Sequence, residues 1–292
     1  MRNSIIIIGI VFFIFFSCTA QDKKTFTLKA NWKKGEVKEM LVQQSSSWKT
    51  NEWEDISPTE TTAKYSITII DKTNKGYLVE WKALIADIEL EEVDFMKDYV
   101  SQFKYLIETD SNGKFKELSN WESLVELNKE LKERVIKEAE KENISRPVLD
   151  HIIAKMELPE TKDELMDMCK GLTEIYLGSY GVELPLNDTT LEPTTIPNQH
   201  LKEGIPVTLK TVIKELDHDK ISMTYSYVYD EEKIKELSKK HFPDQEYTGQ
   251  KTSSYTEYIY NRKTGWIEKI TIHSEFDDGR SMSTAIIEYI IK

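Results

Sequence analysis

Histidine and carboxylate side chains are the groups best suited to hold a metal ion or move a proton, and the chain of 292 residues has five histidines. They are His151, His200, His218, His241 and His273. A zinc site on a helix needs two histidines four positions apart, or a histidine and a glutamate at that spacing with supporting context. None of the five has such a partner, so the sequence indicates no helix-borne metal site.

Carboxylates gather in four short segments that we interpret as turns or solvated surface. Asp217-His218-Asp219 places one imidazole between two carboxylates, which could bind a divalent ion, but the triplet joins two strand-like segments and is typical of a hairpin turn. Asp110-Ser111-Asn112-Gly113 and Asp277-Asp278-Gly279 lack the spaced ligands of a calcium loop. The acidic run from Glu89 to Asp94 is read as a solvated face.

Nucleophile and cofactor motifs are missing from the sequence. There is no Gly-x-Ser-x-Gly elbow, phosphate-binding glycine loop or dinucleotide fingerprint. Cys169 falls on the apolar stripe of a predicted helix, where a free cysteine acts as a small hydrophobe. We therefore predict no catalytic residue, no metal and no cofactor, and a non-enzymatic protein. An alternative is a hydrolase whose carboxylates converge only in the fold, about 5 to 9 Å apart.

The elements that would position such residues follow the order strands, helices, strands. Strand-like alternation covers 25–118, including a strand through Tyr99, Phe103, Tyr105 and Ile107, and it returns over 207–292. The Pro-rich segment 178–206 is predicted to be a long loop or linker. This order predicts one α+β domain over 21–292, with antiparallel meanders forming a curved, half-barrel-like sheet.

Three helices are predicted between residues 119 and 177, packed on that sheet. Ser119 and Glu122 match a capping box before an amphipathic helix from about Asn120 to Lys141. Ser145 and Pro147 open a second helix that ends near Pro159. A second capping box opens the third helix, and its residues are Thr161 and Glu164. A further short helix is expected from Glu231 to Lys240.

The composition is that of a folded, acidic protein. Hydrophobic residues make up 39% of the chain and the formal net charge is −12. A negative surface repels phosphate backbones, which argues against nucleic-acid binding. It also disfavours electrostatic attachment to anionic headgroups, so any membrane contact should be lipophilic.

The first twenty residues read as a signal peptide. Arg2 precedes an apolar run from Ile5 to Phe16, which is shorter than the roughly 20 residues of a membrane span. Phe15-Phe16-Ser17-Cys18 resembles a bacterial lipoprotein signal, which would make Cys18 an acylated lipid anchor. Cleavage after Cys18-Thr19-Ala20, before Gln21, would instead release a soluble protein. We favour the anchor because a cysteine directly after such a run is uncommon.

Several strand and turn segments carry a wider resemblance. They are Leu28–Met40 with Trp32-Lys33-Lys34-Gly35-Glu36, the strand pair from Tyr65 to Trp81, Asn112-Gly113-Lys114 leading to Trp121, and Lys263-Thr264-Gly265-Trp266. Together they resemble an uncharacterised family of secreted or lipid-anchored β-rich envelope proteins of Gram-negative bacteria. More loosely, they are similar to the half-barrels that carry lipoproteins or lipids across the periplasm. The resemblance implies no catalytic residue.

These observations lead to one expected function and two alternatives. We expect an exported protein of the outer membrane or periplasm, anchored at Cys18, that binds an apolar ligand or an envelope protein. The hydrolase is one alternative. The other is a structural or adhesive surface module, for which Trp48 and Trp53 in a polar stretch are the candidate exposed aromatics.

Overall fold

The computed structural model describes residues 24–50, 53–84, 99, 102–156, 158–198, 201–241, 251–277 and 281–292. Antiparallel strands account for 53% of the structure and helices for 26%, which confirms the α+β class. The chain divides into two compact units. Unit 1 comprises residues up to Asn31, Leu41–Thr62 and Gly181–Lys292, and unit 2 comprises Trp32–Met40 and Ala63–Tyr180.

Two long strands contribute residues to both units, and the other elements belong to one unit each. The shared strands are β2 (Val37–Thr50) and β3 (Trp53–Thr73). The strands of unit 1 are β1 (Thr25–Thr27), β7 (Glu183–Pro185), β8 (Thr189–Asn198), β9 (Leu201–Glu215), β10 (Lys220–Tyr229), β11 (Lys251–Asn261), β12 (Ile267–Asp277) and β13 (Ser281–Ile291). Its helix is α5 (Glu231–His241). Unit 2 holds β4 (Gly76–Leu84), β5 (Lys104–Thr109), β6 (Phe115–Leu118), α2 (Trp121–Lys141), α3 (Arg146–Met156) and α4 (Lys162–Leu177).

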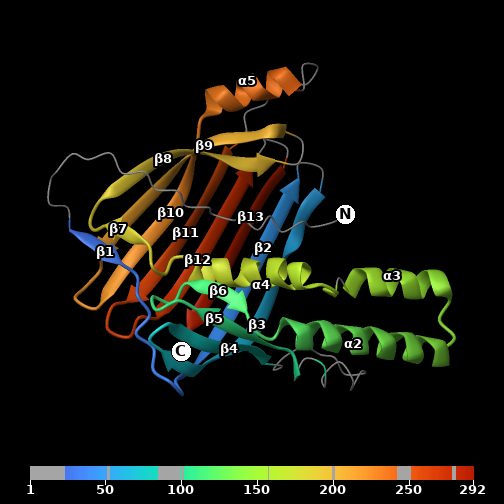
Figure 1. Ribbon diagram of the computed structural model, residues 1–292. Helices are drawn as coiled ribbons and strands as arrows, with labels where there is room; N and C mark the ends of the chain where they lie inside the picture. The colour runs from blue at the N-terminus through green and yellow to red at the C-terminus, as the bar shows by residue number, and fades with distance from the viewer. Residues whose placement is uncertain are drawn as a thin grey trace. The chain divides into compact units, whose positions relative to one another are not determined.

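Unit 1 is built on a curved, open antiparallel sheet in which β8 to β13 lie side by side in sequence order (Figure 1). The registers place Met223 opposite Tyr258, Tyr258 opposite Ile270, and Ile270 opposite Tyr289. Directly paired residues point to the same side of a sheet, so these four side chains share one face. All four are buried, and they form the apolar core of this unit.

One end of that face is covered by residues 24–31, which we name the strap. Its β1 pairs with β7, so that Phe26 lies opposite Leu184. The Phe26 ring meets the ring of Tyr260 edge-on, with 5.4 Å between the ring centroids. The Tyr260 hydroxyl donates a hydrogen bond to the carbonyl oxygen of Lys29 over 2.6 Å. Because Tyr260 lies on the same side of β11 as Tyr258, we call this side the strap face.

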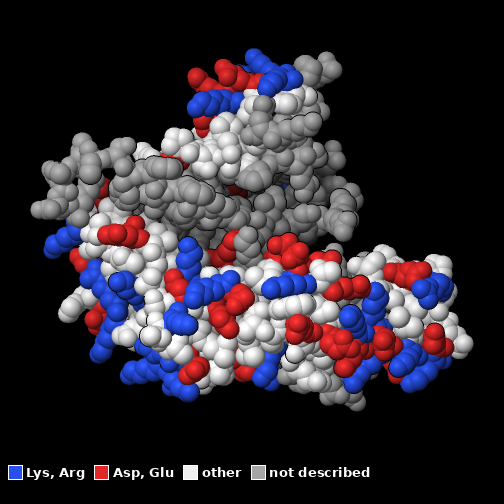
Figure 2. Space-filling view, viewed as in Figure 1, with Lys and Arg blue, Asp and Glu red and all other residues white. Residues whose placement is uncertain are grey.

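In unit 2 the apolar face of the strands packs against α4. Val79, Trp81 and Ile107 are buried on neighbouring strands, and Tyr176 of α4 meets Trp81 edge-on at 5.6 Å between ring centroids. The capping box at the start of α4 is confirmed: the Thr161 hydroxyl accepts from the Glu164 backbone N–H, and the Glu164 carboxylate accepts in return. The outer sides of α2 and α3 carry both signs of charge (Figure 2).

The capping box predicted at Ser119 is wrong. Helix α2 begins at Trp121, one residue after the predicted start at Asn120. Asn120 is its N-cap residue, and the Asn120 side chain makes no capping hydrogen bond. The Asn120 amide instead accepts from the backbone N–H of Leu106 and donates to the carbonyl of Lys104, and the Ser119 hydroxyl donates to the carbonyl of Leu106. The side chains of Ser119 and Asn120 thus bond to backbone groups of β5 and not to the first turn of α2. Short polar side chains can bond to either set of backbone groups, and here β5 takes them.

Two strand predictions are also corrected. The strand expected through Tyr99 starts only at Lys104, because the backbone N–H of Phe103 bonds to the carbonyl of Tyr99 in a helical turn. The segment 178–206, predicted to be irregular, contains β7, β8 and the start of β9. The prediction was wrong because prolines usually interrupt strands, whereas Pro193 lies within β8. Strand β8 is last in the strand order, and an edge strand tolerates a missing N–H.

Candidate functional site

Several of the residues singled out from the sequence lie outside the described part of the chain. This is the case for Cys18, for the acidic run from Glu89 to Asp94, for His200 and for Asp278-Gly279. The side chain of Trp53 is likewise outside it. Trp48 is described, and 45% of it is exposed.

The best sequence candidate for a metal ligand cluster is a turn. One Asp217 carboxylate oxygen accepts hydrogen bonds from the backbone N–H groups of Asp219 and Lys220, both over 2.8 Å. The carboxylate is therefore used to close the connection between β9 and β10. Within the described ranges, no group of three or more His, Cys, Asp or Glu residues is placed to hold a metal ion.

Cys169 is a core residue of unit 2, as predicted. Its side chain is fully buried, and burial raises the pKa of the thiol to about 12. The hydroxyl of Thr173, one turn later in α4, donates to the carbonyl of Cys169 over 2.9 Å. A thiol this hard to ionise is a poor nucleophile at neutral pH.

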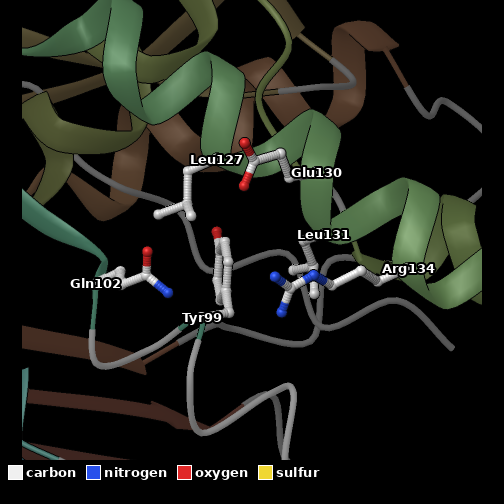
Figure 3. A pocket seen from close by; sticks show the side chains of 6 residues that line it. All are labelled: Tyr99, Gln102, Leu127, Glu130, Leu131 and Arg134. Carbon is white, nitrogen blue, oxygen red and sulfur yellow. The ribbon is translucent and has the colours of Figure 1, made fainter.

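A small depression in unit 2 brings together the phenol of Tyr99, the amide of Gln102, the carboxylate of Glu130 and the guanidinium of Arg134 (Figure 3). Four of its lining residues come from α2, and they face the ring of Tyr99. The Tyr99 hydroxyl donates to Asn128 over 2.6 Å, and burial raises its pKa to about 12. The lining residues are Tyr99, Gln102, Leu127, Glu130, Leu131 and Arg134. With a volume of about 10 Å³, the depression is at the lower limit for one water molecule, so we assign no ligand to it.

The strap face of unit 1 changes character along its strands. Near the strap it is fully buried, whereas further along β10 and β12 the side chains of Tyr227, Tyr229, Ile272 and Phe276 are only partly buried. Apart from Glu215, which pairs with Ile221 at the strap end and forms an ion pair with Arg262, the side chains that alternation and register place on this face over β9–β13 from Val207 onwards carry no charge at neutral pH. They are Val207, Leu209, Thr211, Ile213, Ile221, Met223, Tyr225, Tyr227, Tyr229, Thr252, Ser254, Thr256, Tyr258, Tyr260, Ile270, Ile272, Ser274, Phe276, Ser283, Ala285, Ile287 and Tyr289.

Small side chains form one row across this face. Ser254 pairs with Ser274, and Ser274 pairs with Ala285, so three consecutive strands present small groups side by side. The next row towards the strap contains Ile272 opposite Ile287, and the next row away from it contains Phe276. The row of small residues therefore runs between the row Thr256, Ile272 and Ile287 on the strap side and the row Thr252, Phe276 and Ser283 on the other side. We name these three rows, on β11–β13, the small-residue band.

The opposite face of the same strands is polar and charged. Lys269 and Glu288 form an ion pair at 2.6 Å, and the Ser222 hydroxyl donates to Glu257 over 2.9 Å. On the strap face, by contrast, burial raises the pKa values of the Tyr227 and Tyr229 hydroxyls, which keeps both neutral. Successive residues along each strand point to opposite faces, and the two faces differ in charge.

The sequence reading missed this band, although a signal for it was present. Alternation in β10 puts Tyr225, Tyr227 and Tyr229 on one side, and the same period in β12 and β13 aligns Ile272 with Ile287. What the sequence lacks is the register between strands that brings the three small residues into one row.

Comparisons with known proteins add no assignment. No protein-family model matches the chain, and no curated protein matches it. Among the residues that the structure describes, no helix is long and apolar enough to cross a bilayer.

Proposed function

We propose that this chain is a non-enzymatic, exported protein of the cell envelope, anchored to a membrane through acylated Cys18, which binds an extended acyl chain on the small-residue band of unit 1. The observation that carries the ligand proposal is the row Ser254, Ser274 and Ala285, which is bordered by Ile272 and Ile287 on one side and by Phe276 on the other. The half-barrel-like shape of the sheet, with the three-helix segment packed on it, is part of this proposal.

The dimensions and chemistry of the band suit an acyl chain. Neighbouring strands lie about 4.8 Å apart, so the band extends over about 10 Å across β11–β13, and the uncharged face continues to about 19 Å across the five strands β9–β13. The floor of the band offers small side chains, and its borders offer methyl groups and the Phe276 ring. Contact with methylene groups there costs no desolvation of charge, because none of these residues is ionised. Tyr227 and Tyr229 supply neutral hydroxyls for the polar end of such a ligand.

The ligand proposal is tested by filling the band. Ser274 and Glu275 are adjacent exposed residues of β12 whose side chains point to opposite faces. Equilibrium dialysis with a radiolabelled long-chain fatty acid would compare Ser274→Trp with the matched control Glu275→Trp. We expect Ser274→Trp to weaken binding at least about tenfold, a loss of about 1.4 kcal/mol, and Glu275→Trp to leave it within about twofold. Absence of saturable binding by the unmodified protein, or equal losses in both variants, would refute the proposal.

The anchor is tested separately by intact-mass analysis of the protein from membrane fractions, beside a Cys18→Ala variant. Acylation predicts a mature chain that starts at Cys18 with added lipid mass and sediments with membranes. An unmodified chain that starts at Gln21 in the soluble fraction would show that the ordinary signal-peptidase site is used instead.

A further inference from the structure

The strap is fixed to one end of the unit 1 sheet by contacts along its whole length. At its start, the carbonyl of Lys24 accepts a hydrogen bond from the backbone N–H of Leu186 over 2.8 Å. At its end, the side-chain amide of Asn31 donates to the carbonyl of Lys263 over 3.0 Å, in the turn between β11 and β12. The strap thus crosses the ends of the strands instead of running along them.

A charged and aromatic contact holds the middle of the strap. Arg262 forms an ion pair with Glu215 at the end of β9, and the guanidinium carbon of Arg262 lies 5.5 Å from the ring centroid of Phe26. The Arg262 guanidinium also lowers the pKa of the Glu215 carboxyl. Phe26 therefore lies between Arg262 and Tyr260, and the strap is held to unit 1 from Lys24, its first described residue.

The proposed anchor lies very close to this point in the sequence. Six residue steps separate Cys18 from Lys24, and a fully extended chain covers at most about 3.6 Å per step, or about 22 Å in all. Strands β11 and β12 each contain 11 residues. At about 3.4 Å per residue each of them is about 37 Å long, which exceeds the reach of the tether.

From this geometry we propose that the strap end of unit 1, consisting of the strap and the turn Arg262–Gly265, faces the lipid surface, while the opposite ends of β11 and β12 point away from it. The inference rests on the acylation of Cys18 in the proposed function. The partner surface is the headgroup layer of the anchoring membrane, and the small-residue band then opens away from that layer.

The charges at the strap end are compatible with this contact. The exposed ionic groups of the strap end itself are the cations Lys24, Lys29 and Lys263. The exposed carboxylates Glu183, Asp217 and Asp219 of the segments bonded to it balance these charges, whereas the whole chain carries −12. A balanced end is repelled less by an anionic membrane than an acidic one is, which is compatible with contact between this end and the headgroups.

Fluorescence quenching on the acylated, vesicle-bound protein tests the orientation. Lys263→Cys places a label at the strap end and Glu275→Cys places one near the far end of β12; both positions are exposed. Cys169 is fully buried and does not compete for the label. The vesicles contain phosphatidylethanolamine, phosphatidylglycerol and a lipid with a nitroxide on its headgroup. We expect the label at 263 to be quenched at least about threefold more than the label at 275.

The outcomes separate the two proposals. Equal quenching at both positions, or stronger quenching at 275, in a protein shown by mass analysis to be acylated would overturn the orientation alone. An unacylated chain beginning at Gln21 that does not float with vesicles would overturn the anchor and the orientation together. In the Cys18→Ala variant, quenching at 263 should disappear; if it persists without the anchor, the tether does not set the orientation and the inference is wrong.

Discussion

In both units apolar and polar residues alternate along the strands, but the apolar faces of the two units are covered to different extents. In unit 2, helix α4 covers the face, and Trp81 is sealed by Tyr176. In unit 1, the strap covers one end of the face, and side chains beyond it, such as Tyr227 and Ile272, are only partly buried. None of the residues of α5, the helix of unit 1, is buried. A covered apolar face stabilises the fold, whereas a partly covered one has area left for a ligand.

The largest expected effect is a difference in unfolding free energy between alanine variants of two tyrosines, one at each of these faces. Tyr176→Ala removes a fully buried ring from unit 2 and should lower the free energy of unfolding by about 3–5 kcal/mol, because the cavity cannot be refilled. Tyr227→Ala removes a partly buried ring from unit 1 and should cost about 1 kcal/mol. Urea unfolding of both variants measures this. Similar losses would mean that the face of unit 1 is as tightly packed as that of unit 2.

The strap can be loosened through a single glycine. Gly265 has φ +72°, and a Cβ there would lie 2.2 Å from the backbone nitrogen of Asn31. Gly35, in unit 2, has φ +79° but open space around it, so it serves as the matched control. We expect Gly265→Ala to lower the unfolding free energy by about 2–3 kcal/mol and Gly35→Ala by only about 1 kcal/mol of backbone strain. Equal losses would show that the strap moves aside at no cost.

Alkaline pH should destabilise unit 2 through its buried thiol. The Cys169 pKa is raised to about 12, whereas an unfolded thiol titrates near 8.5, so the folded state keeps a proton that the unfolded state loses. The stabilisation is complete below about pH 8.5 and is lost as the pH rises towards about 12. The slope is up to about 1.4 kcal/mol per pH unit for one group.

A cysteine-free variant isolates this contribution. Unfolding free energies of the unmodified protein and of Cys169→Ala should be compared between about pH 8.5 and pH 10, below the usual tyrosine range. We expect the variant to fall less steeply by up to about 1.4 kcal/mol per unit. Parallel curves would mean that the thiol is accessible to solvent in the folded protein.

Local signals predicted individual elements well where they did not depend on distant residues. Strand β10 was expected from Lys220 to Tyr229 and is found there, because its alternation is regular, a turn precedes it and a helix follows it. The capping box of Thr161 and Glu164 is likewise local and is confirmed. Ser119 failed because the backbone of β5, distant in sequence at Leu106, offers its polar groups to the same side chains.

The sequence by itself determined the α+β class, the core position of Cys169 and the apolar run from Ile5 to Phe16 that precedes Cys18, since each follows from periodicity or composition along the chain. Only the tertiary structure decided that Pro193 lies in a strand, that Phe26 packs between Tyr260 and Arg262, and that small residues align across β11–β13. These features depend on strand register and on contacts between residues that are distant in the sequence. Lys29 and Tyr260, for example, are 231 positions apart. No local pattern specifies such contacts, because they form only when the sheet does.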